Sequence, residues 1–482
     1  MVEVSGAGVA APELSKEVKS LLEKNEATEE CEKARFEAIR GKRVLFVAGD
    51  FMYTSFAPML QKLMKQLRDY GVVVYAVFQS GFEKPSGYFL DCQKGECFDH
   101  CTYANINGPT GAASIMAAVE EANWELDAAY SMHEATQRIV AKVQSGLGLP
   151  GNPVRAYEIA TDKFATRECL AEHNLASIKA TAVFSEKDAS KIAEEVGFPC
   201  VIKPATGMGS AGVYKCANAE ELATTLNRVF ADLRSEWNLQ AGAGEGRAPV
   251  IAETLVMPKL YGDGRINEFD VECLLSPGGE LVYANIIDNW VTKGSFQEVG
   301  SSMPTKMSAE EEKQAKDYAY ACLKAMGFDR GGFHVEVWMT DSGPLLIEVN
   351  SRVGGGATKH SHEAVFGPDV FLQMALTMLG IPINPPRALE PKCAYGYLLP
   401  NAAITGKLIE SPTFLQPAAE HEKVVSSTYF KKGGDMVKGY DKHVSEWLGE
   451  VHIQVDTLEE LFPLMDKLQT EIGELSTLQI VP

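Results

Sequence analysis

The sequence lacks the features that would direct it to a membrane, to nucleic acid or out of the cell. No apolar run in its 482 residues approaches the length of a membrane span, and the first residues lack the basic and apolar regions of a signal peptide. Basic residues are outnumbered, 45 Lys and Arg against 65 Asp and Glu, and they form no dense cluster. We therefore expect a cytoplasmic protein without a nucleic-acid or membrane partner.

Cysteine is present but follows neither of the patterns that would give it a structural role. The ten cysteines mostly stand alone in apolar patterns, which is typical of a reducing compartment and not of a disulfide framework. One cluster combines thiols with an imidazole: Cys92, Cys97, His100 and Cys101. It has no Cys-x-x-Cys pair and its spacing is irregular, so incidental thiols in a loop are a better interpretation than a zinc site.

The chain also lacks internal repeats, low-complexity tracts and a Gly-x-Gly-x-x-Gly turn, so dinucleotide binding is poorly supported. Apolar strands alternate with amphipathic helices instead. The pattern predicts a helical extension over residues 1–40 and a doubly wound parallel sheet over 41–150. A second, mixed domain is expected over 151–388 and a small α+β unit over 389–482. The predicted class is a multidomain α/β and α+β protein.

The segment 332–356 carries the strongest signal. It is typical of two strands around the turn residues 341–344. If Ser342 is the centre of that turn, Glu336 lies directly opposite Glu348. Alternation then places three residues on one face: Glu348, Asn350 and Arg352. Facing carboxylates repel each other, and a divalent cation such as Mg2+ removes the repulsion. The alternative is a half-exposed hairpin with scattered acids.

Two lysines and a glycine-rich loop could bind an anion. Lys163 begins a predicted helix after the capping residue Asp162, and Lys203 ends an apolar strand. Burial of Lys203 in that strand requires an anionic partner, for which a polyphosphate is a good candidate. The loop Gly207–Gly212 joins two strands, and its backbone N–H groups could cradle phosphate. On its own, such a loop is more often a simple turn.

These pieces, in their order along the chain, resemble a known family. The matching elements are Asp162-Lys163-x-x-x-Arg167, Val201-Ile-Lys203-Pro-x-x-Gly-x-Gly-Ser-x-Gly-Val213, Glu253-x-Leu-Val256, Glu268, Glu336 and Glu348-Val-Asn350-x-Arg352. The combination resembles the ATP-grasp carboxylate–amine ligases, and most of all the L-amino-acid (dipeptide) ligases of the carnosine synthase type. It implies an ATP-grasp fold for residues 151–388, with a lid subdomain over about 170–256.

The resemblance implies roles for individual residues. Those that would contact ATP are Lys163, Lys203, Gly207, Gly209, Ser210, Gly212, Glu253, Thr254, Val256 and Glu268. Glu253 would accept a hydrogen bond from the adenine amino group, and Glu268 would bind the ribose, for which Glu272 is a competitor. The residues that would hold Mg2+, or Mn2+ in its place, are Glu336, Glu348 and Asn350. Those implied in catalysis are Arg352, Glu298 and Ser210.

The implied activity is ATP-dependent formation of an amide between a small amino acid, or a related carboxylate, and an amine. An acyl phosphate would activate the carboxylate, and ADP and phosphate would be released. The substrate pair stays open, because the histidine that dipeptide ligases carry three residues after Glu298 is Ser301 here. Two alternatives remain, a bicarbonate-activating enzyme like biotin carboxylase and a non-catalytic nucleotide-binding scaffold. Related ligases are often homodimers, although the sequence marks no interface.

The irregular spacing of the cysteine cluster yields a first prediction. We expect the purified protein to carry no stoichiometric zinc, and elemental analysis measures this directly. About one zinc per chain, lost in a Cys97→Ser variant, would contradict the expectation.

Overall fold

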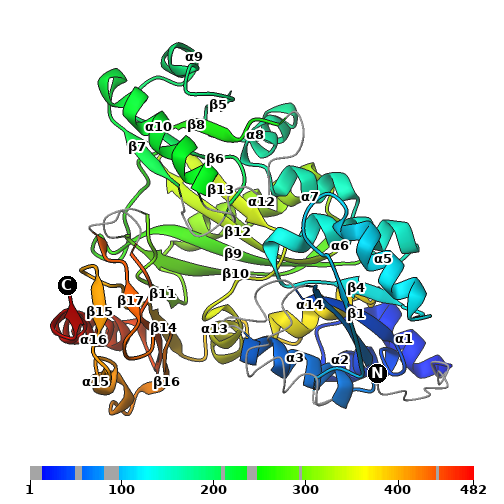
Figure 1. Cartoon of the computed structure of the whole chain (residues 1–482). Helices are drawn as coiled ribbons and strands as arrows, with labels where there is room; N and C mark the ends of the chain where they lie inside the picture. Colours follow the sequence, from blue (N-terminus) through cyan, green and yellow to red (C-terminus); the bar gives the residue numbers. More distant parts are fainter. Residues whose placement is uncertain are drawn as a thin grey trace.

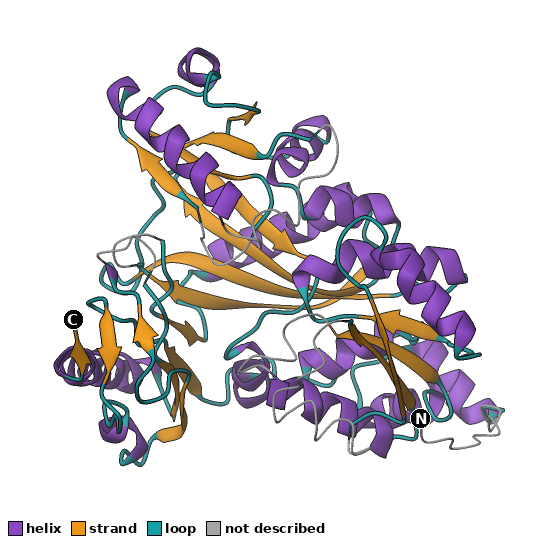
Figure 2. Ribbon diagram, in the orientation of Figure 1, coloured by secondary structure: helices purple, strands orange, loops and turns teal. Residues whose placement is uncertain are grey.

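The computed structural model describes residues 13–48, 57–80, 97–207, 212–235, 247–292, 296–440 and 445–482. The chain is arranged around one long antiparallel sheet (Figure 1). A parallel sheet with its helices lies at one end of this central sheet, a smaller sheet stands above it, and the C-terminal segment closes the other end (Figure 2). Within the described residues, no helix is long and apolar enough to cross a membrane.

The N-terminal part begins with two helices, α1 (Lys16–Lys24) and α2 (Glu29–Ala38). Four parallel strands follow in the order β3-β2-β1-β4, the doubly wound arrangement that the alternating pattern predicts. Their bounds are β1 Arg43–Ala48, β2 Val73–Gln79, β3 His100–Ala104 and β4 Ala128–Tyr130. The helices of this part are α3 (Ala57–Asp69), α5 (Gly111–Glu121), the 3-10 helix η2 (Glu134–Thr136) and α6 (Gln137–Leu147).

Strand β3 is not expected from the sequence. The loop interpretation of the cysteine cluster is wrong for Cys101, which lies exposed on β3, while Cys97 is buried just before the strand. Cys92 lies outside the described residues. The strand is only 5 residues long, so its sequence is too short to show a period. Its parallel pairing with β2 is what makes it a strand.

A smaller antiparallel sheet, here called the lid sheet, has the order β5-β8-β6-β7. Its strands are β5 Ala180–Val183, β6 Cys200–Pro204, β7 Tyr214–Cys216 and β8 Val250–Thr254. Helices α9 (Ala189–Glu195) and α10 (Ala219–Ser235) pack on this sheet, and α8 (Lys163–Glu172) lies beside β5. Helix α7 (Val154–Ala160), which precedes α8, packs against α6 and α8. Cys200 and Ile202 pack against α9 and α10. Because side chains alternate along β6, Val201 and Lys203 face the opposite way, toward the central sheet.

The central sheet has eight strands in the order β13-β12-β9-β10-β11-β14-β18-β16, and every neighbouring pair is antiparallel. Its first five strands along the chain are β9 Ile266–Ser276, β10 Glu280–Trp290, β11 Gly300–Met303, β12 Gly331–Thr340 and β13 Gly343–Asn350. Helix α12 (Ala309–Met326) covers one face, where Phe269, Val271 and Val335 are buried. The other face carries polar side chains beneath the lid sheet, and apolar ones such as Leu274 where α14 (Val370–Met378) packs on it.

The hairpin of β12 and β13 confirms the register predicted from its sequence. Glu336 lies opposite Glu348, and His334 lies opposite Asn350. A β-bulge follows Glu336 and shifts the pairing toward the turn. On β9, the neighbour on the other side, Asp270 lies opposite Glu336. Carboxylates from three adjacent strands therefore come together on the face of the sheet that α12 does not cover.

Helix α14 (Val370–Met378), which follows α13 (Thr358–Val365), joins the N-terminal part to the central sheet. Its side chains share one core with Val44 and Val74 of the parallel sheet and with Leu274 of β9. The C-terminal segment extends the central sheet with β14 (Ala394–Leu398), β16 (Val424–Tyr429) and β18 (Gly449–Val455). Its other elements are β15 (Gly406–Leu408), α15 (Gln416–Ala419), β17 (Met436–Val437), α16 (Leu458–Leu478) and β19 (Ile480–Val481).

Candidate active site

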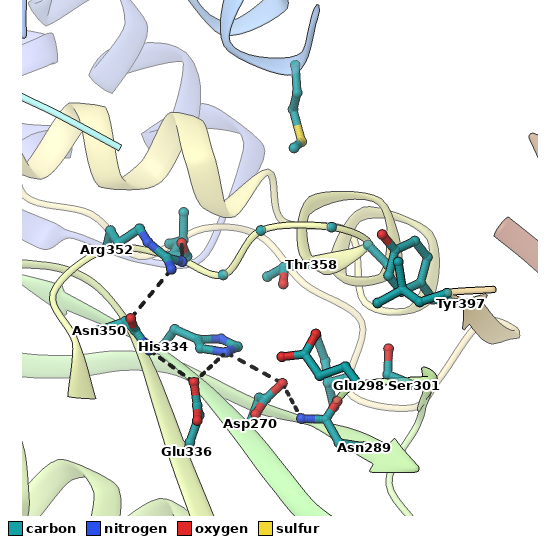
Figure 3. A pocket seen from close by; sticks show the side chains of 18 of the residues that line it. Asp270, Asn289, Glu298, Ser301, His334, Glu336, Asn350, Arg352, Thr358 and Tyr397 are labelled. Carbon is teal, nitrogen blue, oxygen red and sulfur yellow. Dashed lines mark hydrogen bonds and ion pairs between the residues drawn. The ribbon is translucent and has the colours of Figure 1, made fainter. Parts of the chain in front are cut away.

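Two adjoining cavities lie on the polar face of the central sheet, each large enough for a small molecule. The lid cavity, beneath the lid sheet, has a volume of about 360 Å3 and is lined by Lys163, Lys203, Glu253 and Glu268. The turn cavity has a volume of about 320 Å3 and is lined by Asp270, Arg352 and the glycine turn 354–356 (Figure 3). Four residues line both cavities: Asn289, Glu298, Glu336 and Glu348.

The three residues predicted to hold a metal ion converge where the cavities meet. The Asn350 amide nitrogen donates to Oε1 of Glu336 at 3.0 Å and to Oε1 of Glu348 at 3.3 Å. Lys163 lies on the other side of Glu348, with its Nζ 2.7 Å from Oε2. Rotating the Asn350 amide group by 180° points its oxygen toward the two carboxylates instead of its nitrogen. Asn350, Glu336 and Glu348 then offer the oxygen donors that a hard cation prefers. This donor set fits Mg2+ or Mn2+.

The two facing carboxylates have pKa values shifted in opposite directions. Burial raises the pKa of Glu336 well above its usual value, and repulsion from Glu348 adds to the shift. Burial also opposes ionisation of Glu348, but the ammonium of Lys163 outweighs it and lowers the pKa of Glu348. Lys163 therefore compensates one carboxylate of the pair. The charge of Glu336 is the one that a bound cation would neutralise.

The buried lysine of the lid sheet has a partner within the protein. Lys203 Nζ lies 2.6 Å from Oε2 of Glu253, and Arg167 Nε lies 2.8 Å from Oε1 of the same carboxylate. Glu253 thus supplies an anionic partner for Lys203 within the protein, and the contact of Lys203 with a polyphosphate stays a prediction. Arg167 also donates to the carbonyl of Ile347 at 2.8 Å, so α8, the lid sheet and β13 meet at this point.

The two neighbouring cations keep the buried carboxylate of Glu253 ionised. Burial disfavours the carboxylate, but Arg167 and Lys203 outweigh burial and lower the pKa of Glu253 to about 2. Burial lowers the pKa of Lys203 as well, against the attraction of Glu253. Both oxygens of Glu253 are occupied by cations, so its contact with an adenine amino group stays a prediction. Its neighbours Thr254 and Val256 line the lid cavity, as their predicted role requires.

Lys163 is positioned by the start of α8. The side chain of Asp162 accepts from the backbone N–H groups of Phe164 and Ala165, which confirms the predicted cap. Gly207 lines the lid cavity and lies at one end of the predicted phosphate loop, and Gly212 lies at the other. Both have positive φ, 147° and 71°, conformations that favour glycine. Gly209 and Ser210 lie outside the described residues.

The structure separates the two carboxylates that compete for the ribose. Glu268 lines the lid cavity. Glu272 is 1% exposed and contacts Nδ1 of His334 and the backbone N–H of Gly354, the latter at 3.1 and 3.3 Å. The Glu272 carboxylate is thus hydrogen-bonded to the glycine turn. Glu268, which lines the lid cavity, is the better placed of the two to contact the ribose of a nucleotide.

The predicted catalytic residues Arg352 and Glu298 both line the turn cavity (Figure 3). Arg352 donates to Oδ1 of Asn350 at 3.4 Å and to the carbonyl of Val353 at 2.9 Å. The walls of the cavity and the nearby Asp270 carboxylate raise the pKa of Glu298 to about 7. Ser301, which replaces the histidine of dipeptide ligases, also lines this cavity.

Sequence reasoning misses Asp270 and the walls that the C-terminal segment contributes. Asp270 stands between Glu268 and Glu272 on β9, and the spacing of two residues was a signal that all three share a face. Tyr397 and Trp447 line the turn cavity from β14 and from the segment before β18. No local motif marks them, because only the antiparallel pairing of β11 with β14 brings this segment to the site.

The ion pairs of Glu253 yield a prediction for stability. The change Glu253→Gln should lower the free energy of unfolding by about 3–5 kcal/mol, because Arg167 and Lys203 keep their buried charges without a counter-charge. Urea unfolding at neutral pH measures the difference. The exposed Glu280→Gln is a matched control and should unfold like the unmodified protein.

The same carboxylate predicts a pH dependence. The pKa of Glu253 is lowered from 4.5 to about 2, so its stabilising contribution is complete above pH 4.5 and is lost as the pH falls toward 2. The stability difference between the unmodified protein and Glu253→Gln should therefore shrink over that range. If the stability difference stays constant between pH 4.5 and 2, the substitution acts through packing and not through the charge of Glu253.

Comparisons with known proteins agree with this geometry. Residues 196–360 match the model of the ATP-grasp domain family. The chain is 27% identical over 370 residues to carnosine synthase 1 of Mus musculus, an alignment that covers 74% of this chain and 42% of the synthase. It is 29% identical over 246 residues to alanine–anticapsin ligase of Bacillus subtilis (strain 168), which covers 50% of this chain and 51% of that ligase. The chain thus spans less than half of the length of carnosine synthase.

Solved structures show the same fold. The L-amino acid ligase from Bacillus licheniformis superposes with a TM-score of 0.71 and 19% identity, covering 90% of this chain and 98% of that one. Phosphoribosylglycinamide synthetase from Anaerococcus prevotii gives a TM-score of 0.60 at 17% identity. The ordered motifs, the family match over residues 196–360 and the shared fold identify an ATP-grasp domain in this chain, which is similar in sequence to carnosine synthase and alanine–anticapsin ligase.

Proposed function

We propose that this protein is an ATP-dependent ligase that joins a small amino acid, or a related carboxylate, to an amine and releases ADP and phosphate. One observation carries the proposal: a cavity lined by lysines, Lys163 and Lys203 among them, and a cavity with an arginine meet at the carboxylates Glu336 and Glu348. A nucleotide in the lid cavity and a carboxylate in the turn cavity would therefore face each other across this acidic junction.

The residues of the lid cavity suit the nucleotide. Lys163 and Lys203 would bind phosphates, and Glu268 would bind the ribose. Mg2+ held by Glu336, Glu348 and Asn350 would neutralise phosphate charge when bound. Lys163 is paired with Glu348 in this structure, so an incoming phosphate would compete with that carboxylate for the ammonium, and the cation would take the place of Lys163 beside Glu348.

The residues of the turn cavity suit the two other substrates. Arg352 would orient the substrate carboxylate toward the terminal phosphate and stabilise the charge that develops during transfer. The carboxylate oxygen bonds to that phosphorus, and ADP leaves. The amine nitrogen then bonds to the activated carbonyl carbon, and phosphate leaves. Glu298 would bind an ammonium group of the amino-acid substrate, and the attacking amine would pass its proton to the departing phosphate.

The relatives support this class of reaction, since their names are those of ligases that act on amino acids. Biotin carboxylase from Campylobacter jejuni shares the fold with a TM-score of 0.62, but at 14% identity the likeness does not extend to activity. Dependence of ATP cleavage on bicarbonate would favour that alternative, and absence of ATP cleavage with every amino-acid pair would favour a non-catalytic scaffold.

A charge change at the junction tests the metal site. In Glu348→Gln, one carboxylate that the cation needs is lost, so turnover should fall by at least about a hundredfold while the fold is retained. Phosphate release measures turnover, and circular dichroism measures folding. Glu280→Gln, at the exposed start of β10, is the matched control. Near-normal turnover in Glu348→Gln would remove this residue from the site.

The products test the reaction itself. Activation at the terminal phosphate yields one ADP and one phosphate for each amide, and no AMP or pyrophosphate. Amino acids supplied in pairs with ATP and Mg2+ should give a product whose mass is the sum of the pair less one water. Chromatography of the nucleotides decides the mechanism, because AMP as the stoichiometric product would reject it.

A further inference from the structure

The wall of the turn cavity varies in chemical character. One end is acidic, with Asp270 and Glu298 facing the interior near Asn289 (Figure 3). Other parts of the wall are apolar, with Leu399, Phe430 and Trp447 from the C-terminal segment and Met59, Leu60 and Phe371 from α3 and α14. Arg352 lies on the opposite wall from Glu298 in Figure 3. This arrangement bears on which amino acid the cavity selects, a question that the proposed function leaves open.

Asp270 has an unused hydrogen-bonding position. Its side chain is 6% exposed, and its Oδ2 accepts from Asn289 Nδ2 at 2.8 Å and lies 3.5 Å from Nε2 of His334. Its Oδ1 is buried and has no hydrogen-bond partner among the described residues. Asp270 and Glu298 both line the cavity, and an incoming cation would compensate their charge. An ammonium group between Asp270 and Glu298 supplies both the donors and the charge.

The aromatic residues of the apolar wall direct their polar atoms away from the cavity. The indole Nε1 of Trp447 donates to the carbonyl of Glu298 at 3.1 Å, and the hydroxyl of Tyr397 donates to Glu450 at 2.9 Å. Both rings therefore have their polar atoms satisfied away from the cavity. Leu399 and Phe430 line the same wall without polar atoms to offer. A charged side chain placed here would lose its water and gain no partner.

We propose that the turn cavity binds an α-amino acid with a bulky apolar side chain. Its ammonium lies between Asp270 and Glu298, and its carboxylate faces Arg352. Its side chain packs against Leu399, Phe430 and Trp447. The proposal rests on the proposed function for the chemistry that follows binding, but not for binding itself. Asp270 acquires a role in binding the amine, and the C-terminal segment acquires one in selecting the side chain.

Direct binding tests the cavity without the reaction. Calorimetric titration of the full chain with L-phenylalanine or L-leucine should give affinities at least about tenfold tighter than with glycine or L-aspartate, because the apolar wall contacts only the larger side chains. In Asp270→Asn the affinity for L-phenylalanine should fall at least about tenfold, because the ammonium loses one of its charges. Asp341→Asn, whose side chain is 98% exposed in the hairpin turn, is the matched control.

The wall is tested by a change of selectivity. Trp447→Ala should weaken the binding of L-phenylalanine and leave that of glycine unchanged, so the ratio of the two affinities falls. Phe430→Ala should do the same and serves if Trp447→Ala does not fold. Unchanged KM for ATP, or unchanged ATP binding in an inactive protein, shows that the lid cavity is intact. Phe184→Ala, which removes a 57% exposed ring on the lid, is the control.

The outcomes of the two proposals are distinguishable. If no amino-acid pair produces ADP but L-phenylalanine still binds through Asp270 and Trp447, the proposed function fails and the cavity assignment stands. If ADP forms but glycine, L-aspartate or L-lysine is preferred over L-phenylalanine, the assignment is overturned. It is equally overturned if Asp270→Asn and both wall variants bind L-phenylalanine as the unmodified protein does.

Discussion

The opposition of Glu336 and Glu348 across one hairpin is the constraint on which the rest of the site depends. Two carboxylates on the same face of adjacent strands, away from bulk water, cannot both stay ionised without cations nearby. Lys163 supplies the first positive charge from the start of α8, 2.7 Å from Glu348. The raised pKa of Glu336 shows that the charge is not fully compensated. A bound cation would compensate the remaining charge.

A second set of charges ties the lid sheet to the same hairpin. Glu253 of β8 bonds to Lys203 of β6 and to Arg167 of α8, and Arg167 continues to the backbone of β13. The cost of burying three charges is met only when all three partners are in place. The position of the lid sheet relative to the predicted metal ligands therefore depends on the same ion pairs. In this way Lys203 is held at the lid cavity with its ammonium directed to the interior.

Much of the site could be predicted because strands impose a period of two on their side chains. Alternation predicts that Glu336 and Glu348 share a face, but the turn is centred between Asp341 and Ser342, and the β-bulge after Glu336 is what brings the two residues opposite each other. The cap of α8 by Asp162 is equally local. The loop interpretation of Cys101 failed for the opposite reason, since a strand as short as β3 exists only through its neighbour. The spacing of two residues between Glu268, Asp270 and Glu272 indicated that Asp270 shares their face, but the motifs of the family do not include Asp270.

By itself, the sequence determined the α/β class, the hairpin with its facing carboxylates and the cap of α8, because alternation, capping and turn chemistry act between near neighbours in the chain. The tertiary structure alone decided that Glu253 is the partner of Lys203, that Glu272 supports the glycine turn and that Glu268 faces the lid cavity. It also brought Tyr397 and Trp447 to the turn cavity, across pairings between distant strands. Contacts of that kind depend on how whole sheets pack, and no local pattern encodes which side chains they bring together.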